Sequence, residues 1–237
     1  MFRADIVGRH RQRLIKASRC PHWQPRRSMF SSSVIQELLI WKINMTEATS
    51  KAESSLQSRP NLSHVGIYVW DIKKIEDFYC KTLDLVVTDR GVGRRFQNQL
   101  VFMSSQPNMH HQLALASGRA QNAPSTVMQL SFKVTKLDQL RSTRTKALAN
   151  GATEMFGLNH GNAWSIYFND PEGNLVEVYV DTPFYVPQPH GDPLELEKTD
   201  EQLLRETEEA CRKDPGFMLV SEWDRLMSQR LENDKAH

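Results

Sequence analysis

The fold of this chain is decided by LSHVGIYVWDIKKIEDFY, residues 62–79, and by VMQLSFKVTKLDQLRSTR, residues 127–144. Each stretch begins with alternating apolar and polar residues, a pattern that is typical of a half-buried strand. Each then changes to helical spacing. The apolar positions of this spacing are Ile72, Ile75 and Phe78 in the first stretch and Leu137 and Leu140 in the second, and Asp71 stands where a helix N-cap is expected. The same pattern at two places predicts two equivalent structural modules.

Each copy continues into further strands. The last strands are HHQLALASG, residues 110–118, and NLVEVYVDT, residues 174–182. DPEGN, residues 170–174, predicts a tight turn before the second of them. We therefore expect an α+β fold, in which two paired βαβββ modules form one domain that is followed by C-terminal helices.

The repeat places four residues at equivalent positions. His64 corresponds to Gln129 on the first strands, and Ala114 corresponds to Glu177 on the last strands. If the two sheets pair into one curved surface, these positions face a shared cleft. Three of the side chains can bind a divalent cation through nitrogen or oxygen, and alanine cannot. Taken singly, a histidine at a strand start is more often a surface or capping residue, and Glu177 fits the outward residue of an edge strand.

Composition limits the function. The chain has 237 residues, 39% of them hydrophobic, and a formal net charge of +2, so no overall field favours nucleic acid. Cys20, Cys80 and Cys211 are far apart, which argues against a disulfide framework or a thiolate zinc site and for a reducing compartment. No apolar run approaches the roughly 18 to 20 residues of a membrane span. We expect a soluble protein with no nucleic-acid or membrane partner.

The N-terminal region differs from the rest. Up to Ser33 it holds seven arginines and one lysine against one acid, Asp5. This bias is typical of a mitochondrial transit peptide, with a disordered extension or an over-long gene model starting at Met45 as alternatives. We expect a cytoplasmic location, with mitochondria as the alternative.

Four regions are expected along the chain. A basic extension over residues 1–44 and a flexible lead-in over residues 45–61 precede the domain of residues 62–190. A helical extension follows over residues 191–237, where Thr199 and Gln202 predict a capping box. The pattern of this extension favours a solvated amphipathic tail over a lid or a dimerisation element.

The quoted stretches, with HHQLALAS and HGNAWSIYFNDPEGNLVEVYVDTP, resemble the vicinal oxygen chelate superfamily. This superfamily includes glyoxalase I, methylmalonyl-CoA epimerase, bleomycin-resistance proteins and type I extradiol dioxygenases. The resemblance runs from about residue 62 to 190 and is closest to the one-domain dioxygenases that cleave biphenyl-2,3-diol and catechol rings. It implies a metal held by His64, Gln129 and Glu177 at the mouth of an incomplete barrel.

Gln129 departs from the ring-cleaving pattern, which has a second histidine at this position. Two imidazoles and one carboxylate suit Fe(II), whereas a glutamine oxygen in place of one imidazole gives a site that accepts harder metal ions. The resemblance therefore implies Fe(II), with Mn(II), Mg(II) or Co(II) as alternatives. It also leaves open a non-redox isomerase or lyase of the glyoxalase or epimerase type, and a binding protein that sequesters a small molecule.

The resemblance implies three catalytic residues. His111 would be the acid/base group, because histidine exchanges a proton near neutral pH. Tyr167 would donate a hydrogen bond to a substrate oxygen, and His160 would line the pocket. The ordinary alternatives are a turn cap for His160 and a buried aromatic with a satisfied hydroxyl for Tyr167. We expect neither His110 nor His111 to bind the metal, because the register places the metal-equivalent position at Ala114.

These observations together predict a metal-dependent extradiol-type dioxygenase that cleaves a catechol-like ring with O2. A homo-oligomer is compatible with this prediction.

Overall fold

The structure is a computed structural model that describes residues 59–125 and 127–234. The basic extension predicted over residues 1–44, and nearly all of the lead-in, lie outside these ranges. Within them, no helix is long and apolar enough to cross a membrane.

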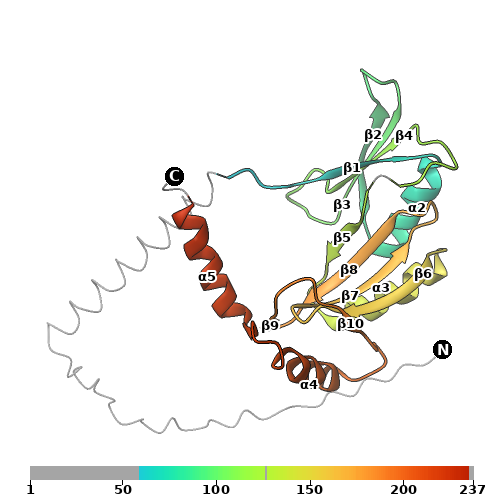
Figure 1. The fold of residues 1–237 in the computed structure, drawn as a ribbon. Helices are drawn as coiled ribbons and strands as arrows, with labels where there is room; N and C mark the ends of the chain where they lie inside the picture. Colours follow the sequence, from blue (N-terminus) through green and yellow to red (C-terminus); the bar gives the residue numbers. More distant parts are fainter. Residues whose placement is uncertain (1–58, 126, 235–237) are drawn as a thin grey trace, which may run out of the picture. The chain divides into compact units, whose positions relative to one another are not determined.

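The first half of the described chain, which we call module 1, contains one helix and four strands (Figure 1). Its elements are β1 (Val65–Val69), α2 (Ile72–Leu83), β2 (Val86–Val92), β3 (Gln99–Ser104) and β4 (Leu113–Ser117). The strands form one sheet in the order β1-β4-β3-β2. β1 and β4 are parallel, and the other neighbours are antiparallel.

The second half, module 2, repeats this topology. Its elements are β5 (Leu130–Lys133), α3 (Leu137–Ala149), β6 (Thr153–Asn159), β7 (Ala163–Asn169) and β8 (Leu175–Asp181). The sheet has the order β6-β7-β8-β5, with β5 and β8 parallel and the short strand β10 (Asp192–Pro193) added at the β6 edge. The two predicted βαβββ modules are therefore confirmed.

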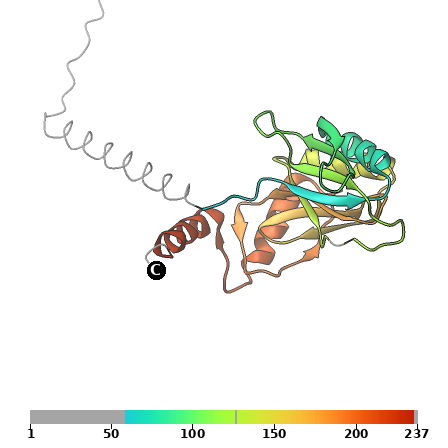
Figure 2. The ribbon, with the colours of Figure 1, turned by 90° about the horizontal axis from the view of Figure 1, so that it is seen from above.

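Local sequence explains the two helices. Asp71 caps α2, because its carboxylate accepts from the backbone amide of Lys74 at 3.0 Å, as predicted. Ile75 and Phe78 face inward from α2, and Leu137 and Leu140 face inward from α3. The two helices lie side by side (Figures 1 and 2).

Strand alternation divides each sheet into a core face and an open face. On β8 the side chains of Val176, Val178 and Val180 are buried in the core. On β4 the core residues are Leu113 and Leu115. Burial of each such side chain contributes about 1.5 to 3 kcal/mol. The residues between them, which include Glu177, point to the opposite face.

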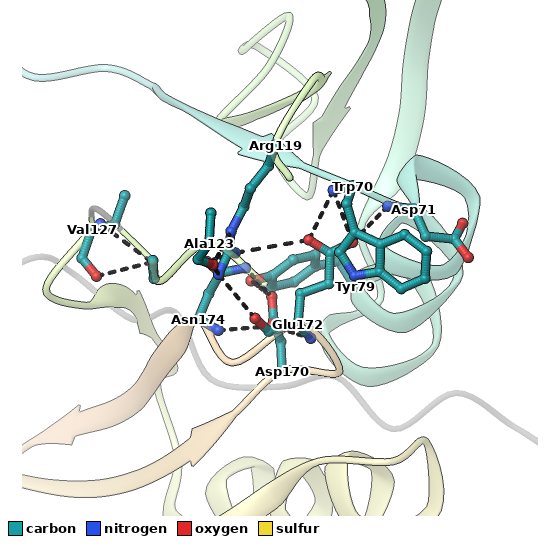
Figure 3. A network of polar contacts seen from close by, with 10 residues as sticks. Trp70, Asp71, Tyr79, Arg119, Ala123, Val127, Asp170, Glu172 and Asn174 are labelled. Carbon is teal, nitrogen blue, oxygen red and sulfur yellow. Dashed lines mark hydrogen bonds and ion pairs between the residues drawn. The ribbon is translucent and has the colours of Figure 1, made fainter. Parts of the chain in front are cut away.

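A buried polar network joins the two modules (Figure 3). Glu172, in the predicted turn between β7 and β8, accepts from the backbone amides of Trp70 and Asp71 at 2.7 to 3.1 Å. The Tyr79 hydroxyl donates to Asp170 at 3.0 Å. Arg119 lies 3.8 Å from the Glu172 carboxylate. A turn of module 2 therefore caps the start of the module 1 helix.

The C-terminal extension is more tightly packed than the sequence suggests. It contains β10, α4 (Asp200–Cys211), β11 (Met218–Leu219) and α5 (Val220–Asn233), and β11 pairs with β9 (Phe184–Tyr185), which precedes the extension. The capping box of Thr199 and Gln202 is present. Leu203, Thr207 and Cys211 of α4 are buried, so the expectation of a solvated tail is wrong for this helix. It holds for α5, which has no buried residue.

Candidate active site

Glu177 is a buried carboxylate on the open face of the module 2 sheet. A buried charge is stable only when its lone pairs are satisfied. Four side chains donate to it: Gln129 Nε2 to Oε2 at 3.0 Å, Ser131 Oγ to Oε2 at 2.6 Å, Ser165 Oγ to Oε1 at 2.9 Å and Tyr167 OH to Oε1 at 2.6 Å. The carboxylate is therefore held in one orientation by two neighbouring strands and by the residue that precedes β5.

Strand register explains this cluster. Tyr167 lies opposite Glu177 across β7 and β8, and Ser131 lies opposite Glu177 across β5 and β8. The sequence prediction missed Ser131 and Ser165. Both were detectable, because Ser131 is two residues after Gln129 and Ser165 two before Tyr167, and residues two apart on a strand share a face.

Tyr167 connects Glu177 to His160. The phenolic oxygen lies 3.0 Å from Nε2 of His160, whose Nδ1 lies 2.6 Å from the carbonyl oxygen of His190. Burial, and then the neighbouring Glu177, raise the pKa of Tyr167 well above its ordinary value. The Phe156 ring stacks on Tyr167 with centroids 5.0 Å apart. The phenol therefore stays protonated and acts as a hydrogen-bond donor.

A second polar cluster contains three histidines of module 1. The rings of His64 and His111 have centroids 4.2 Å apart. His111 Nδ1 lies 2.9 Å from His110 Nδ1, and His110 Nε2 lies 2.8 Å from Asp89 Oδ2. Burial, and then the neighbours His64 and His110, lower the pKa of His111. The neutral ring of His111 is therefore favoured near neutral pH.

The structure assembles the predicted site in two parts. It brings Gln129, Tyr167 and His160 to Glu177, and it brings His64 to His111. Over the two described ranges, no hydrogen bond or ring contact joins these parts. Nor does any group of three His, Cys, Asp or Glu side chains lie where it could hold a metal ion.

Both parts border β5. A hollow of about 380 Å³ next to His64 is lined also by Ser131 and Lys133 of this strand. Ser131 donates to Glu177 as well. Ala114, the fourth equivalent position, lies on β4 between the core residues Leu113 and Leu115 and carries no polar group.

The donor atoms suit a divalent cation, but one copy of the chain does not gather them. A carboxylate, an amide oxygen and an imidazole are ligands for borderline and hard metals. Gln129 turns its amide nitrogen to Glu177, which leaves its carbonyl oxygen available. Gln129 and Glu177 are ligands of the right chemical type, but the four donors occupy the lone-pair sites of the carboxylate, so Glu177 binds a metal only when at least one donor turns away. His64 lies in the other cluster.

Comparisons with known proteins agree with the fold. Residues 61–178 match the sequence model of the Glyoxalase/Bleomycin resistance protein/Dioxygenase superfamily. Biphenyl-2,3-diol 1,2-dioxygenase 2 of Rhodococcus globerulus is 24% identical over 131 residues, 53% of this chain. The match spans 65% of the length of that relative.

Two solved structures are similar to part of this chain at low identity. The fosfomycin resistance protein FosX of Listeria monocytogenes, solved with Mn(II) and sulfate, is 18% identical, with a TM-score of 0.42. The match covers 52% of this chain and 94% of FosX. A glyoxylase/bleomycin resistance protein/dioxygenase domain from Frankia sp. EAN1pec is 18% identical, with a TM-score of 0.41, over 52% of this chain and 99% of that domain.

The matched residues begin just before β1 and end within β8, so they include both βαβββ modules. The chain therefore belongs to the glyoxalase, bleomycin resistance protein and dioxygenase superfamily, the vicinal oxygen chelate fold.

Proposed function

We propose that this chain is a metal-dependent extradiol-type dioxygenase that cleaves a catechol-like ring with O2. The observation that carries the proposal is the buried Glu177 carboxylate, which accepts from the Tyr167 hydroxyl, whose oxygen also lies 3.0 Å from Nε2 of His160. Tyr167, whose pKa is raised by burial and by Glu177, is a perturbed titratable group of the kind that gathers at functional sites. The name of the Rhodococcus globerulus relative supports the ring-cleaving chemistry.

The metal ligands are proposed to be Gln129, Glu177 and His64. Fe(II) is the first expectation, and Mn(II), Mg(II) or Co(II) are the alternatives, because Gln129 offers an oxygen in place of an imidazole nitrogen. When bound, the metal supplies a charged centre for the two substrate oxygens and a path for electrons to O2.

His64 is proposed to reach the site from a second copy of the chain. Within one copy it contacts His111 and not Glu177. In a symmetric dimer each copy can complete the site of the other. His64→Ala and Glu177→Gln variants are then each inactive alone, and a mixture that is unfolded and refolded together regains activity. If refolded mixtures stay inactive while refolded wild-type protein is active, His64 does not act across copies.

The side chains have separate tasks in this scheme. His111 takes the proton from a substrate hydroxyl, and Tyr167 donates a hydrogen bond to a substrate oxygen. His160 holds the phenol of Tyr167 from the other side. In the overall reaction the ring carbon–carbon bond adjacent to the two hydroxyl-bearing carbons breaks, and both atoms of O2 enter the open-chain product.

A second candidate is an isomerase or lyase of the glyoxalase or epimerase type. Gln129 favours it, because a site with fewer imidazoles suits the transfer of protons better than the reduction of O2. In this case the same residues would stabilise an enediolate without an oxidant.

The deciding experiment is to load the full-length chain with Fe(II) without oxygen, add substituted catechols, and then admit O2. Oxygen uptake and a yellow ring-fission product support the dioxygenase. The absence of both, with turnover of hemithioacetal or thioester substrates under Mn(II) or Co(II), supports the second candidate. Binding of catechols without any turnover indicates sequestration.

Two carboxylate variants make this test specific. Glu177→Gln is expected to lower kcat/KM at least about 100-fold, because it removes a metal ligand and the acceptor for four donors. Glu76→Gln changes a comparably buried carboxylate in module 1 and is expected to leave kcat/KM within about twofold of the wild type. Equal losses in both variants would mean that Glu177 acts through stability alone.

A further inference from the structure

The chain after β8 lies directly against the residues of the proposed site. His160 and Gly161 form the turn after β6, and the segment of residues 186–190, which we call the strap, packs on this turn. Gly161 has φ of 73°, and a Cβ atom there would lie 2.5 Å from Val186 Cγ2 and 3.0 Å from Cys211 Sγ. Only glycine fits such a close approach. The turn that carries His160 is therefore shaped against the strap and α4.

The strap supplies a hydrogen-bond partner to His160. The carbonyl oxygen of His190 lies 2.6 Å from Nδ1 of the imidazole. A carbonyl can only accept, so Nδ1 carries a hydrogen. The other nitrogen, Nε2, then faces the Tyr167 phenol at 3.0 Å. In the neutral ring Nε2 can then only accept, so it competes with Glu177 Oε1 for the single phenolic hydrogen of Tyr167. The strap therefore determines which nitrogen of His160 meets the phenol.

Gln188 holds the strap in this position. Its Nε2 donates to the carbonyl oxygen of His160 at 2.8 Å and to that of Val186 at 3.3 Å. Its Oε1 accepts from the backbone amide of His190 at 3.1 Å. One side chain thus connects the backbone of His160 to the peptide whose carbonyl receives the Nδ1 hydrogen.

Helix α4 supports the turn from the other side. The buried hydroxyl of Thr207 accepts from Asn159 Nδ2 at 2.8 Å and from Trp164 Nε1 at 2.9 Å. These two residues flank the turn, at the end of β6 and in β7. The strap and α4 follow the residues that match the superfamily, which end at residue 178, and they make all of these contacts.

We propose that Gln188 is a positioning residue for His160: it fixes the His190 carbonyl against Nδ1 and so keeps Nε2 directed at the phenol of Tyr167. This inference deepens the proposed function and rests on it for its catalytic meaning. The structural part, the hydrogen-bonded state of the His160 ring, does not depend on which reaction the site performs.

The test compares Gln188→Leu with Gln229→Leu in the full-length chain. Gln229 lies on α5 and is exposed, so the same substitution there is a matched control. The imidazole nitrogens of His160 are observed by two-bond ¹H–¹⁵N correlation in protein loaded with diamagnetic Mg(II). In parallel, kcat and KM are measured for a substrate that the wild type converts.

We expect Gln188→Leu to shift the His160 signals from the Nδ1–H pattern to an average of both tautomers. We expect kcat to fall about fivefold with KM unchanged, the size of effect expected when one orienting hydrogen bond is lost. Gln229→Leu keeps the wild-type spectrum and kcat. If Gln188→Leu does not fold, Gln188→Glu is used, which keeps the acceptor for His190 and loses the donor to His160, and the same shift is expected.

A wild-type spectrum of His160 in the folded variant overturns the proposal, even if kcat falls. The lower kcat would then have a cause other than the orientation of the His160 ring. If the wild-type protein converts no substrate, the proposed function fails, and the spectrum alone still decides whether Gln188 orients the ring.

Discussion

The backbone amides at the start of the helix find different hydrogen-bond acceptors in the two modules. At the start of α2, the backbone amides of Trp70 and Asp71 donate to Glu172, which belongs to module 2. At the start of α3, the amides of Thr135 and Lys136 donate to Gln139, which belongs to α3 itself. The same position in the fold is thus satisfied across the molecule in one module and locally in the other.

The loops that face these helix starts differ in the same way. The β7–β8 turn of module 2 is buried against α2, with the Glu172 carboxylate fully buried. Ser105 and Gln106, in the β3–β4 loop of module 1, face the start of α3 across a hollow of about 470 Å³. The start of the module 1 helix is therefore held by Glu172 of module 2 in addition to its own Asp71, whereas Gln139 of module 2 serves the matching place in α3.

The substitution with the largest expected effect removes the contact from module 2 to the start of α2. Glu172→Ala leaves two backbone amides and Arg119 without their carboxylate, and we expect the free energy of unfolding to fall by about 3 kcal/mol. Gln139→Ala is the matched local change and is expected to cost about 1 kcal/mol. Urea unfolding with unchanged slope measures both. Equal losses would show that the cap from module 2 is no stronger than the local one.

A smaller effect tests where the chemistry lies. Tyr167→Phe keeps the stacking on Phe156 and removes the hydroxyl between His160 and Glu177. We expect kcat to fall about tenfold to hundredfold with little change in KM, because a positioned proton donor is lost. Tyr68→Phe alters an exposed tyrosine of module 1 and should have no effect. Unchanged kcat in Tyr167→Phe would remove the phenol from the mechanism.

The smallest effect concerns the buried carboxylate of module 1. Burial acts most strongly on Glu76 and raises its pKa, but Arg90 and Lys73 together outweigh it, so the pKa is lowered. A lowered folded-state pKa gives stability that is present above the unfolded value of about 4.3 and lost as pH falls below it.

Glu76→Gln should therefore lower the free energy of unfolding by about 1 kcal/mol at neutral pH, a modest loss because the Arg90 side chain is largely in solvent. The gap to the wild type should close as pH falls through the acid range. Thermal unfolding across pH measures it, with the exposed Glu232→Gln as control. A gap that stays constant with pH would contradict the assigned charge pairing.

Local patterns predicted the fold well. The Asp71 cap, the turn at DPEGN and the capping box at Thr199 each depend on residues within four positions of one another, and all three are confirmed. The repeat predicted the modules because strand and helix periods recur in the same order. These features need no knowledge of how distant segments pack.

The candidate site was only partly predictable, because a repeat shows which residues are equivalent but not which faces meet. The repeat placed Gln129 and Glu177 at equivalent positions facing one cleft, and these two side chains are hydrogen-bonded. Tyr167 came from the resemblance alone, and it also donates to Glu177. The repeat could not show that His64 would lie on His111. The contact of His160 with the His190 carbonyl depends on a chain reversal after β8 that no local pattern encodes.

The parallel pairing of β5 with β8 has a consequence for how the protein folds. These strands are the first and last of their module, so the sheet closes only after the whole module has collapsed. Pairings between distant segments form late and slowly. Ser131 and Glu177 are opposite each other in this pairing, so the carboxylate gains Ser131 and Gln129 in the closing step, whereas Ser165 and Tyr167 reach it from β7. A chain that stalls before this step has neither a finished sheet nor a site.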